Sequence, residues 1–268
     1  MNLTPLEPGP GPCTELCTRT TELGGTVPAE LRRLLDTHAA VRAWQPAATA
    51  DHLARAITDG SFTAKNAGEY LDTELARPTT EPREIRGKAE TIILRTFATA
   101  VRNGAGDAIV ESVRPVFDKA KAGVVDASAW ITPSTTAEQV IEFGPDALQA
   151  WYDLGHHHRT LEQVNGLVAL FLDAFRLVAR QPFMRHGSAP RAAFYVRDET
   201  VNLDSAAEAL APENNTGRGG RWLRLLTASD LTLNTPTRAA EIIAAQQAEY
   251  ERLQREEYDA SHPAYESA

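Results

Sequence analysis

The stretch LEQVNGLVALFLDAFRLVARQ, residues 161–181, decides how this chain folds. From Leu167 onward it is apolar almost all the way round a helix, and a helix of that kind is normally buried. Thr160 and Gln163 form a capping box that would begin this helix. The remaining positions form one narrow stripe at steps of four and three: Glu162, Gly166, Ala169, Asp173, Arg176 and Arg180. We therefore predict a central core helix with this stripe at the surface or at an interface.

The segments on both sides of this helix predict a mainly α fold. Residues 28–44 begin with a proline at a first helical position, and residues 81–106 form the best amphipathic helix of the first half, ending at Gly104. Helical signals also cover residues 49–60 and 63–78. We expect a multi-helix body of about eight or nine helices, judged from the spacing of apolar residues and caps.

A small β element is expected in the C-terminal third. Residues 192–203, AAFYVRDETVNL, carry β-branched and aromatic residues in near alternation, which is typical of short strands or a hairpin. Residues 221–227 and 231–234 are interpreted as further short strands. A charged C-terminal helix then begins at Pro236.

The predicted organisation has five parts. They are a flexible Pro/Gly-rich arm (1–26), a helical body (27–182), a mixed loop and short-strand region (183–234), a C-terminal helix (235–260) and a tail (261–268).

Composition limits the plausible partners. The net charge of the 268 residues is −9, so nucleic acid is an unlikely partner. The most apolar segment is too short for a bilayer and contains Asp173 and Arg176, so we expect no membrane contact. The first residues do not resemble a signal peptide, which favours a cytoplasmic protein, or a virion location for a phage gene. Cys13 and Cys17 are interpreted as ordinary thiols, and we expect no cofactor.

The run His156, His157 and His158 is the leading chemical candidate, because imidazole binds transition metals and transfers protons. Consecutive helical residues point about 100° apart, so three adjacent histidines do not converge on one ion. Gly155 is expected to end one helix and Thr160 to begin the next, which would place the run in a joint between helices. We favour this joint, and a metal-binding enzyme or sensor is the alternative.

A second candidate is the Arg/Gly segment 217–224. Arg218, Arg221 and Arg224 would contact phosphates, with Trp222 as a stacking face, in a nucleic-acid-contacting regulator. The other interpretation is a glycine loop that leads into a strand. Its arginines would then be solvated or paired with acidic residues: Asp198, Glu199 and Glu213.

The terminal helix is the candidate for protein contacts. Ile243 and Tyr250 are seven residues apart, and Leu253 belongs to a second weak heptad series, so these three residues form a candidate interaction seam. The nucleophile-elbow, phosphate-loop and zinc-protease signatures are absent from the sequence, which favours a non-enzyme. The sequence thus favours a structural or assembly protein that acts through protein–protein contacts or self-association, with a phage virion or capsid role as one version.

Overall fold

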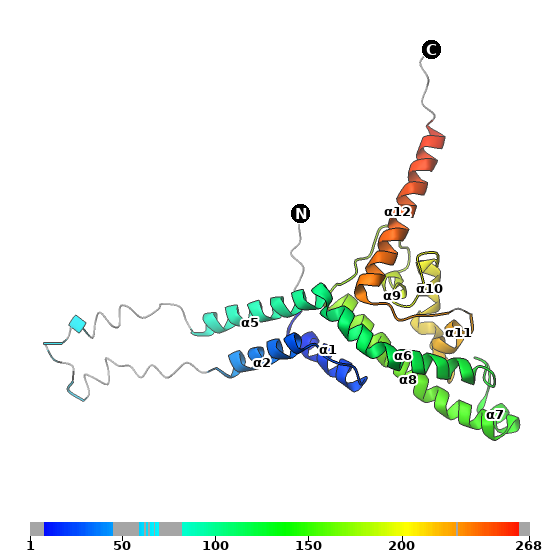
Figure 1. The fold of residues 1–268 in the computed structure, drawn as a ribbon, viewed down its shortest axis with the longest axis horizontal. Coiled ribbons are helices and arrows are strands. Elements are labelled where there is room, and N and C mark those ends of the chain that lie inside the picture. Colours follow the sequence, from blue (N-terminus) through cyan, green and yellow to red (C-terminus); the bar gives the residue numbers. More distant parts are fainter. Residues whose placement is uncertain are drawn as a thin grey trace, which may run out of the picture.

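The computed structural model describes residues 8–44, 59–61, 63, 65–66, 68–69, 82–228 and 230–262. Within these ranges all regular structure is helical. Two long helices run side by side through the centre, one helical pair extends to one side, and a single helix projects from the body (Figure 1). The helical signals predicted at 49–60 and 63–78 and most of the predicted tail lie outside the described residues.

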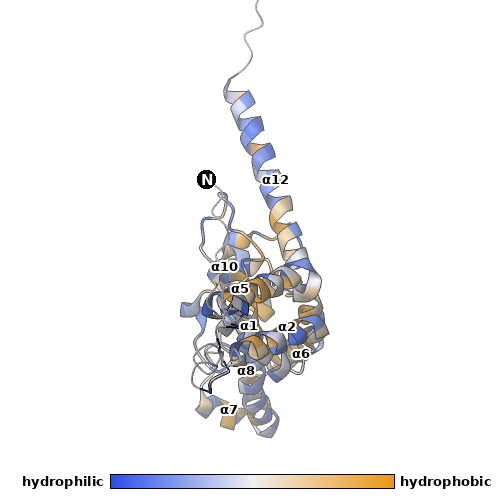
Figure 2. Ribbon diagram, turned by 90° about the vertical axis from the view of Figure 1, so that its left-hand side faces the viewer, coloured by the Kyte–Doolittle hydropathy of each residue, from blue (hydrophilic) through white to orange (hydrophobic). Residues whose placement is uncertain are grey.

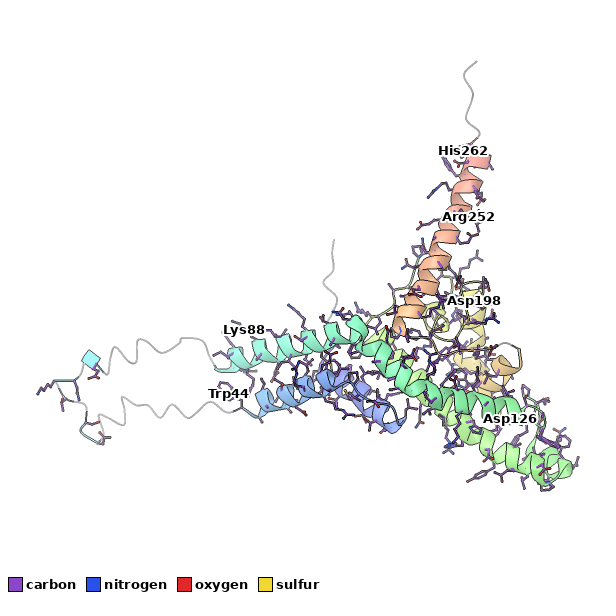
Figure 3. All side chains as sticks on the ribbon, in the orientation of Figure 1. Trp44, Lys88, Asp126, Asp198, Arg252 and His262 are labelled. Atoms are coloured by element: carbon purple, nitrogen blue, oxygen red, sulfur yellow. The ribbon has the colours of Figure 1, made fainter. Side chains whose placement is uncertain are left out.

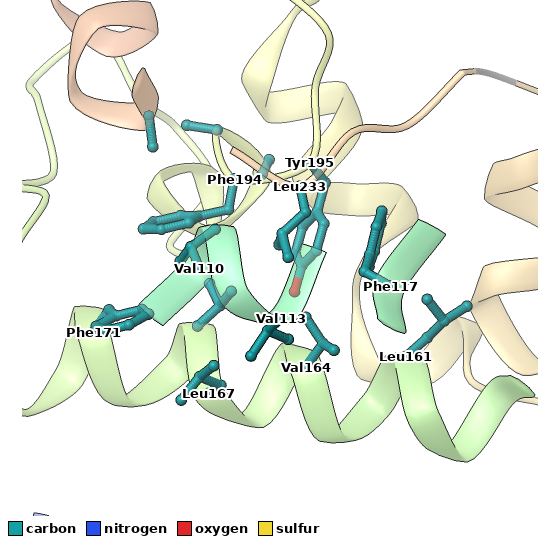
Figure 4. Packing of buried hydrophobic residues seen from close by; sticks show 14 of the residues in the cluster. Val110, Val113, Phe117, Leu161, Val164, Leu167, Phe171, Phe194, Tyr195 and Leu233 are labelled. Atoms are coloured by element: carbon teal, nitrogen blue, oxygen red, sulfur yellow. The ribbon is translucent and has the colours of Figure 1, made fainter. Parts of the chain in front are cut away.

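The centre of the fold is the pair α6 (Gly106–Ala127) and α8 (Pro145–Asp173). Apolar residues of both helices are buried against each other and against the C-terminal third: Val110, Val113, Phe117, Leu161, Val164, Leu167, Phe171, Phe194, Tyr195 and Leu233 (Figure 4). The predicted core helix is therefore confirmed. Large apolar side chains recur on α8 at helical spacing, and their burial fixes its position.

The end of α8 differs from the prediction, because the helix stops at Asp173 instead of continuing to residue 181. Arg176 takes a left-handed φ of 50°, and the chain turns. The turn buries Phe175 completely, with its ring 6.0 Å from that of Phe97. Tertiary burial of an aromatic ring thus outweighs the helical propensity of this segment.

The N-terminal third consists of α1 (Pro10–Glu22), α2 (Ala29–Ala43) and α5 (Pro82–Ala100). Residues 1–26 were expected to form a flexible arm, whereas residues 10–22 form α1 with Cys13, Leu16 and Thr20 buried. These three residues lie at helical spacing, and Pro10 suits the first helical turn because it needs no N–H donor there. The helix after α5 is interrupted at Gly104, where φ is 114°, as the sequence predicted.

The C-terminal third contains α9 (Ala189–Ala192), α10 (Leu203–Ala209), the 3-10 turn η2 (Pro212–Asn214) and α11 (Gly220–Ala228). The predicted β element is wrong, because the described residues contain no strand and residues 221–227 belong to α11. Trp222, Leu223, Leu225 and Leu226 are buried. The free energy gained by burying these side chains in the helical conformation outweighs the β propensity of the segment.

The other two predicted strand segments do approach each other without forming a sheet. The Thr232 backbone N–H donates to the Tyr195 carbonyl over 3.1 Å, and the Asn234 N–H donates to the Phe194 carbonyl over 2.8 Å. Consecutive residues Phe194, Tyr195 and Val196 are all buried, so the alternation of buried and exposed side chains that a half-exposed strand would show is missing here.

The last helix, α12 (Pro236–Ser261), is capped at its N-terminus by Thr235, whose side chain accepts a hydrogen bond from the Arg238 N–H. Its first turns pack on the body through Ala239, Ile242 and Ile243. Beyond these turns the helix projects outward, and its projecting part is mostly hydrophilic (Figure 2). In the described part of the chain, none of the helices has the length and apolar character needed to cross a bilayer.

Candidate functional site

The histidine run lies inside the continuous helix α8, so the predicted joint between two helices is wrong. Gly155 does not end a helix. Instead, the guanidinium group of Arg218 covers it and donates from Nε to the Trp151 carbonyl over 3.0 Å. A Cβ atom at position 155 would lie 2.6 Å from Arg218 Cζ. The glycine therefore permits close packing, and the Thr160 hydroxyl donates back to the His156 carbonyl instead of capping a new helix.

The three imidazole rings have different surroundings. His156 is exposed, and its ring centroid lies 5.9 Å from that of His157. The His157 ring packs on Gly123 of α6, and burial together with the neighbouring His156 lowers its pKa. His158 Nε2 lies 2.9 Å from Asn215 Oδ1 and 3.8 Å from a Glu162 oxygen. Within the described ranges, no group of three or more His, Cys, Asp or Glu side chains is arranged to hold a metal ion.

A cavity of about 590 Å³ lies beside the run, between α6 and α8. Its polar lining includes Lys119, Asp153 and Thr160, together with two of the histidines. Asp153 accepts a hydrogen bond from Gln149 over 2.8 Å. The Gln149 amide thus orients this carboxylate.

Two of the four nucleic-acid candidates are interior residues. Arg221 is 6% exposed and Trp222 is fully buried. Arg221 donates from Nε and Nη2 to the two Glu162 oxygens over 2.9 and 2.5 Å, and Trp222 Nε1 donates to Glu162 Oε1 over 2.8 Å. This bidentate pair joins α11 to α8. Trp222 therefore presents no free face to a base in this structure.

The buried polar contacts continue beyond this pair. The Trp222 ring meets Tyr195 edge-on at a centroid distance of 5.3 Å, and the Tyr195 hydroxyl donates to Asn165 Oδ1 over 3.3 Å. Burial raises the pKa of Tyr195 well above its usual range. The phenol thus stays protonated and acts as a structural donor.

The remaining two arginine candidates also have partners inside the protein. The Arg218 guanidinium lies 5.8 Å from the centroid of the Trp151 ring, and Arg224 Nη2 donates to Thr216 Oγ1 over 3.2 Å. The arginines of segment 217–224 therefore hold the loop against the body. The acidic residue that binds Arg221 is Glu162, which lies 59 positions before it in the chain and was not among the predicted acidic partners.

The candidate interaction seam on α12 is divided. Ile243 is buried in the core, whereas Tyr250 and Leu253 are exposed and line a cavity of about 600 Å³. The Tyr250 ring packs against Phe183, with the centroids 6.0 Å apart. Only the outer part of the predicted seam is therefore accessible to a partner.

One end of the molecule carries an exposed apolar feature that the sequence patterns did not predict. Helix α7 (Ala137–Phe143) is capped by Thr136 and Gln139, as their spacing predicts, and Gly144, with φ 96°, connects it directly to α8. Four large apolar side chains of α7 and the first turns of α8 face solvent, and we call them the apolar tip: Ile141 (70% exposed), Phe143 (51%), Leu148 (51%) and Tyr152 (71%).

The position of Val140 explains part of this exposure. Val140 is completely buried and anchors α7, so the adjacent Ile141 points away from the body. The sequence did contain a signal for this exposure: Val140 and Ile141 are adjacent apolar residues on a short helix, and both cannot face the same core.

Comparisons with protein-family models, with curated proteins and with solved structures find no match for this chain.

Proposed function

We propose that this chain is a non-enzymatic structural or assembly protein that acts through contacts with protein partners or with copies of itself. The observation that supports this best is the apolar tip. Large apolar side chains scattered singly on a surface are ordinary, whereas several at one end of a molecule are typical of protein-contact sites. The tip stands at the end of α7 and α8, away from the projecting helix α12 (Figure 1).

The internal use of the polar candidates supports the same proposal. Arg221 and Trp222 are bound to Glu162, and His158 lies against Asn215. The side chains that suggested metal or nucleic-acid chemistry therefore contribute to the fold. A phage capsid or virion role is the finer version of the proposal. It is motivated by the projecting, charged α12 and by the absence of the nucleophile-elbow, phosphate-loop and zinc-protease signatures from the sequence.

Self-association tests the proposal directly. Size-exclusion chromatography with light scattering should show an oligomer whose mass rises with concentration. The double variant Ile141→Glu/Tyr152→Glu should be monomeric, because burying two carboxylates at a contact is unfavourable. Ile92→Glu on α5 is the matched control, since Ile92 is 62% exposed and lies outside the tip. A wild-type protein that stays monomeric and also captures no partner protein would contradict the proposal, and a control that dissociates as readily as the tip variant would remove the tip from it.

A further inference from the structure

Another cavity, separate from the histidine run 156–158 and from the apolar tip, lies where α2 and α5 run side by side next to the start of α1. The C-terminal end of α2, at Trp44, meets the N-terminal part of α5, near Lys88 (Figure 3). The cavity has a volume of about 500 Å³. The lining residues that matter here are Pro10, His38, Arg42, Arg83, Arg86 and Glu90.

The charge of this lining is predominantly positive. The lining includes three arginines, Arg42, Arg83 and Arg86, and one acidic residue, Glu90. Arg86 and Glu90 are one helical turn apart, yet no ion pair joins them within the described residues. Comparable pairs elsewhere are closed: Arg19 with Glu15, Arg114 with Glu111, and Arg252 with Glu256. Among the described residues, the lining of the cavity therefore has an excess of positive charge.

His38 supplies the second, independent observation. Its side chain lines this cavity and the residue is only 7% exposed, but it has no hydrogen-bond partner among the described residues. Other imidazoles of the protein do have partners: His158 contacts Asn215, and His186 contacts Ser188. Because His38 lines the cavity and has no hydrogen-bond partner among the described residues, its N–H donor is available to a ligand there. An imidazole carries at least one N–H donor in either of its protonation states.

We propose that this cavity binds a small oxyanion carrying two or more negative charges, in the form of phosphate or carboxylate groups. Guanidinium groups match both through paired N–H donors, and such charge-assisted bonds are the strong ones. Three guanidinium groups and one carboxylate leave two positive charges for the ligand. The volume falls in the range of small-molecule sites, roughly 300–1,000 Å³. His38 donates to an oxygen of the anion at the inner wall of the cavity.

Isothermal titration calorimetry on the full-length protein tests the site, in a chloride buffer of low ionic strength. Pyrophosphate and citrate are the two probes, and they separate the phosphate from the carboxylate source. We expect one molecule bound per chain, with affinity that falls as salt is raised. Arg42→Gln/Arg86→Gln should weaken binding by roughly tenfold or more, since it removes two charged donors. Arg33→Gln is the matched control, because Arg33 is an exposed arginine of α2 that does not line the cavity.

Tighter binding of pyrophosphate assigns the site to phosphate ligands, and tighter binding of citrate assigns it to carboxylates. Either result supports the proposal when the double variant loses binding and Arg33→Gln keeps it. Absence of saturable binding by both probes overturns it, as does equal binding by the wild type and the double variant. Circular dichroism must show that the double variant folds, and the single variant Arg42→Gln replaces it if folding fails. This experiment is independent of self-association through the apolar tip.

Discussion

Replacing Glu162 with alanine removes the acceptor that joins α11 to the central helix α8. Three hydrogen bonds end on this carboxylate, two from Arg221 and one from Trp222 Nε1. After the substitution, Arg221 keeps its bond to the Leu210 carbonyl but loses its counter-charge. A buried guanidinium without a counter-charge is the largest expected penalty.

The expected loss of stability follows from the burial of the pair. Removing one partner of a buried ion pair costs about 3–5 kcal/mol. The Glu162 side chain is 26% exposed and that of Arg221 is 7% exposed, so water reaches part of the vacated space. We therefore expect the free energy of unfolding to fall by about 2–4 kcal/mol. For a chain of this size that corresponds to a melting temperature lower by roughly 5–15 °C.

Urea unfolding followed by tryptophan fluorescence measures this change, with thermal unfolding as a second readout. The matched control is Glu249→Ala on the projecting α12. Glu249 accepts the same two-point contact, from Arg252 Nε over 2.8 Å and from Nη2 over 2.6 Å, but both side chains are more than half exposed. We expect the control to change stability little, because solvent screens and replaces an exposed pair.

A double substitution separates the lost counter-charge from lost packing. In Glu162→Leu/Arg221→Met no charge remains buried, so the double variant should be more stable than Glu162→Ala alone. The reasoning is refuted if Glu162→Ala costs less than about 1 kcal/mol, the value of an ordinary hydrogen bond. It is also refuted if Glu249→Ala is as destabilising, or if the double variant is the least stable of the set.

Three further outcomes are expected. Gly123→Ala should lower the free energy of unfolding by about 1–3 kcal/mol in urea titrations, because the new Cβ would lie less than 3.0 Å from the His157 ring, and adding His157→Ala should restore stability. The pKa of His157 is lowered in the folded protein, so the unfolded chain binds the proton more tightly, and the free energy of unfolding should fall as the pH drops below about 6.5. Urea titrations at several pH values should show this fall, and His157→Gln should flatten it. Burial raises the pKa of Cys13 to about 12 and that of Cys17 to about 11. Both thiols should therefore react slowly with a disulfide reagent at pH 8 in the native protein and rapidly in urea. Fast labelling of the native protein would contradict their burial.

The sequence predicted those parts of the fold that depend on apolar periodicity. Residues 161–173 are the core of α8 because large apolar side chains surround that helix, and no partner is needed to infer its burial. The Thr136–Gln139 cap and the interruption at Gly104 were likewise predictable, since both depend on neighbouring residues. Signals of this kind depend only on residues within about one helical turn of each other in the sequence.

The errors occurred where a distant residue changes the meaning of a local signal. Gly155 has the pattern of a helix end, but Arg218 lies across it, and that contact spans more than sixty residues. Residues 221–227 have β propensity, but burial of Trp222 and its bond to Glu162 favour the helix. The buried stripe of α1 was hidden by the proline and glycine residues at its start. Exposure of the apolar tip depends on where the body ends, which sequence periodicity does not define.

Close packing of polar side chains on glycines explains why histidines and arginines that were candidates for metal or nucleic-acid binding instead stabilise the fold. Arg218 covers Gly155, His157 covers Gly123, and Arg19 of α1 lies over Gly166 of α8. At each place a long or planar polar side chain lies directly on the backbone of a neighbouring helix. A glycine there shortens the distance between elements, so a polar group contributes packing as well as hydrogen bonds.

This arrangement separates the two kinds of surface on the protein. Histidines and arginines near α8 are occupied in joining α6, α11 and the 217–224 loop to the central helix, so replacing them should first affect stability. The apolar tip and the cavity at His38 do not join elements of the described fold, because Ile141 and Tyr152 face solvent and His38 has no hydrogen-bond partner among the described residues. A substitution at either place should therefore change binding while leaving the free energy of unfolding nearly unchanged. Comparing both quantities for Tyr152→Glu and Glu162→Ala distinguishes a contact surface from a structural one: each should alter only its own quantity, and a tip variant that unfolds the protein would remove the basis for the proposed contact.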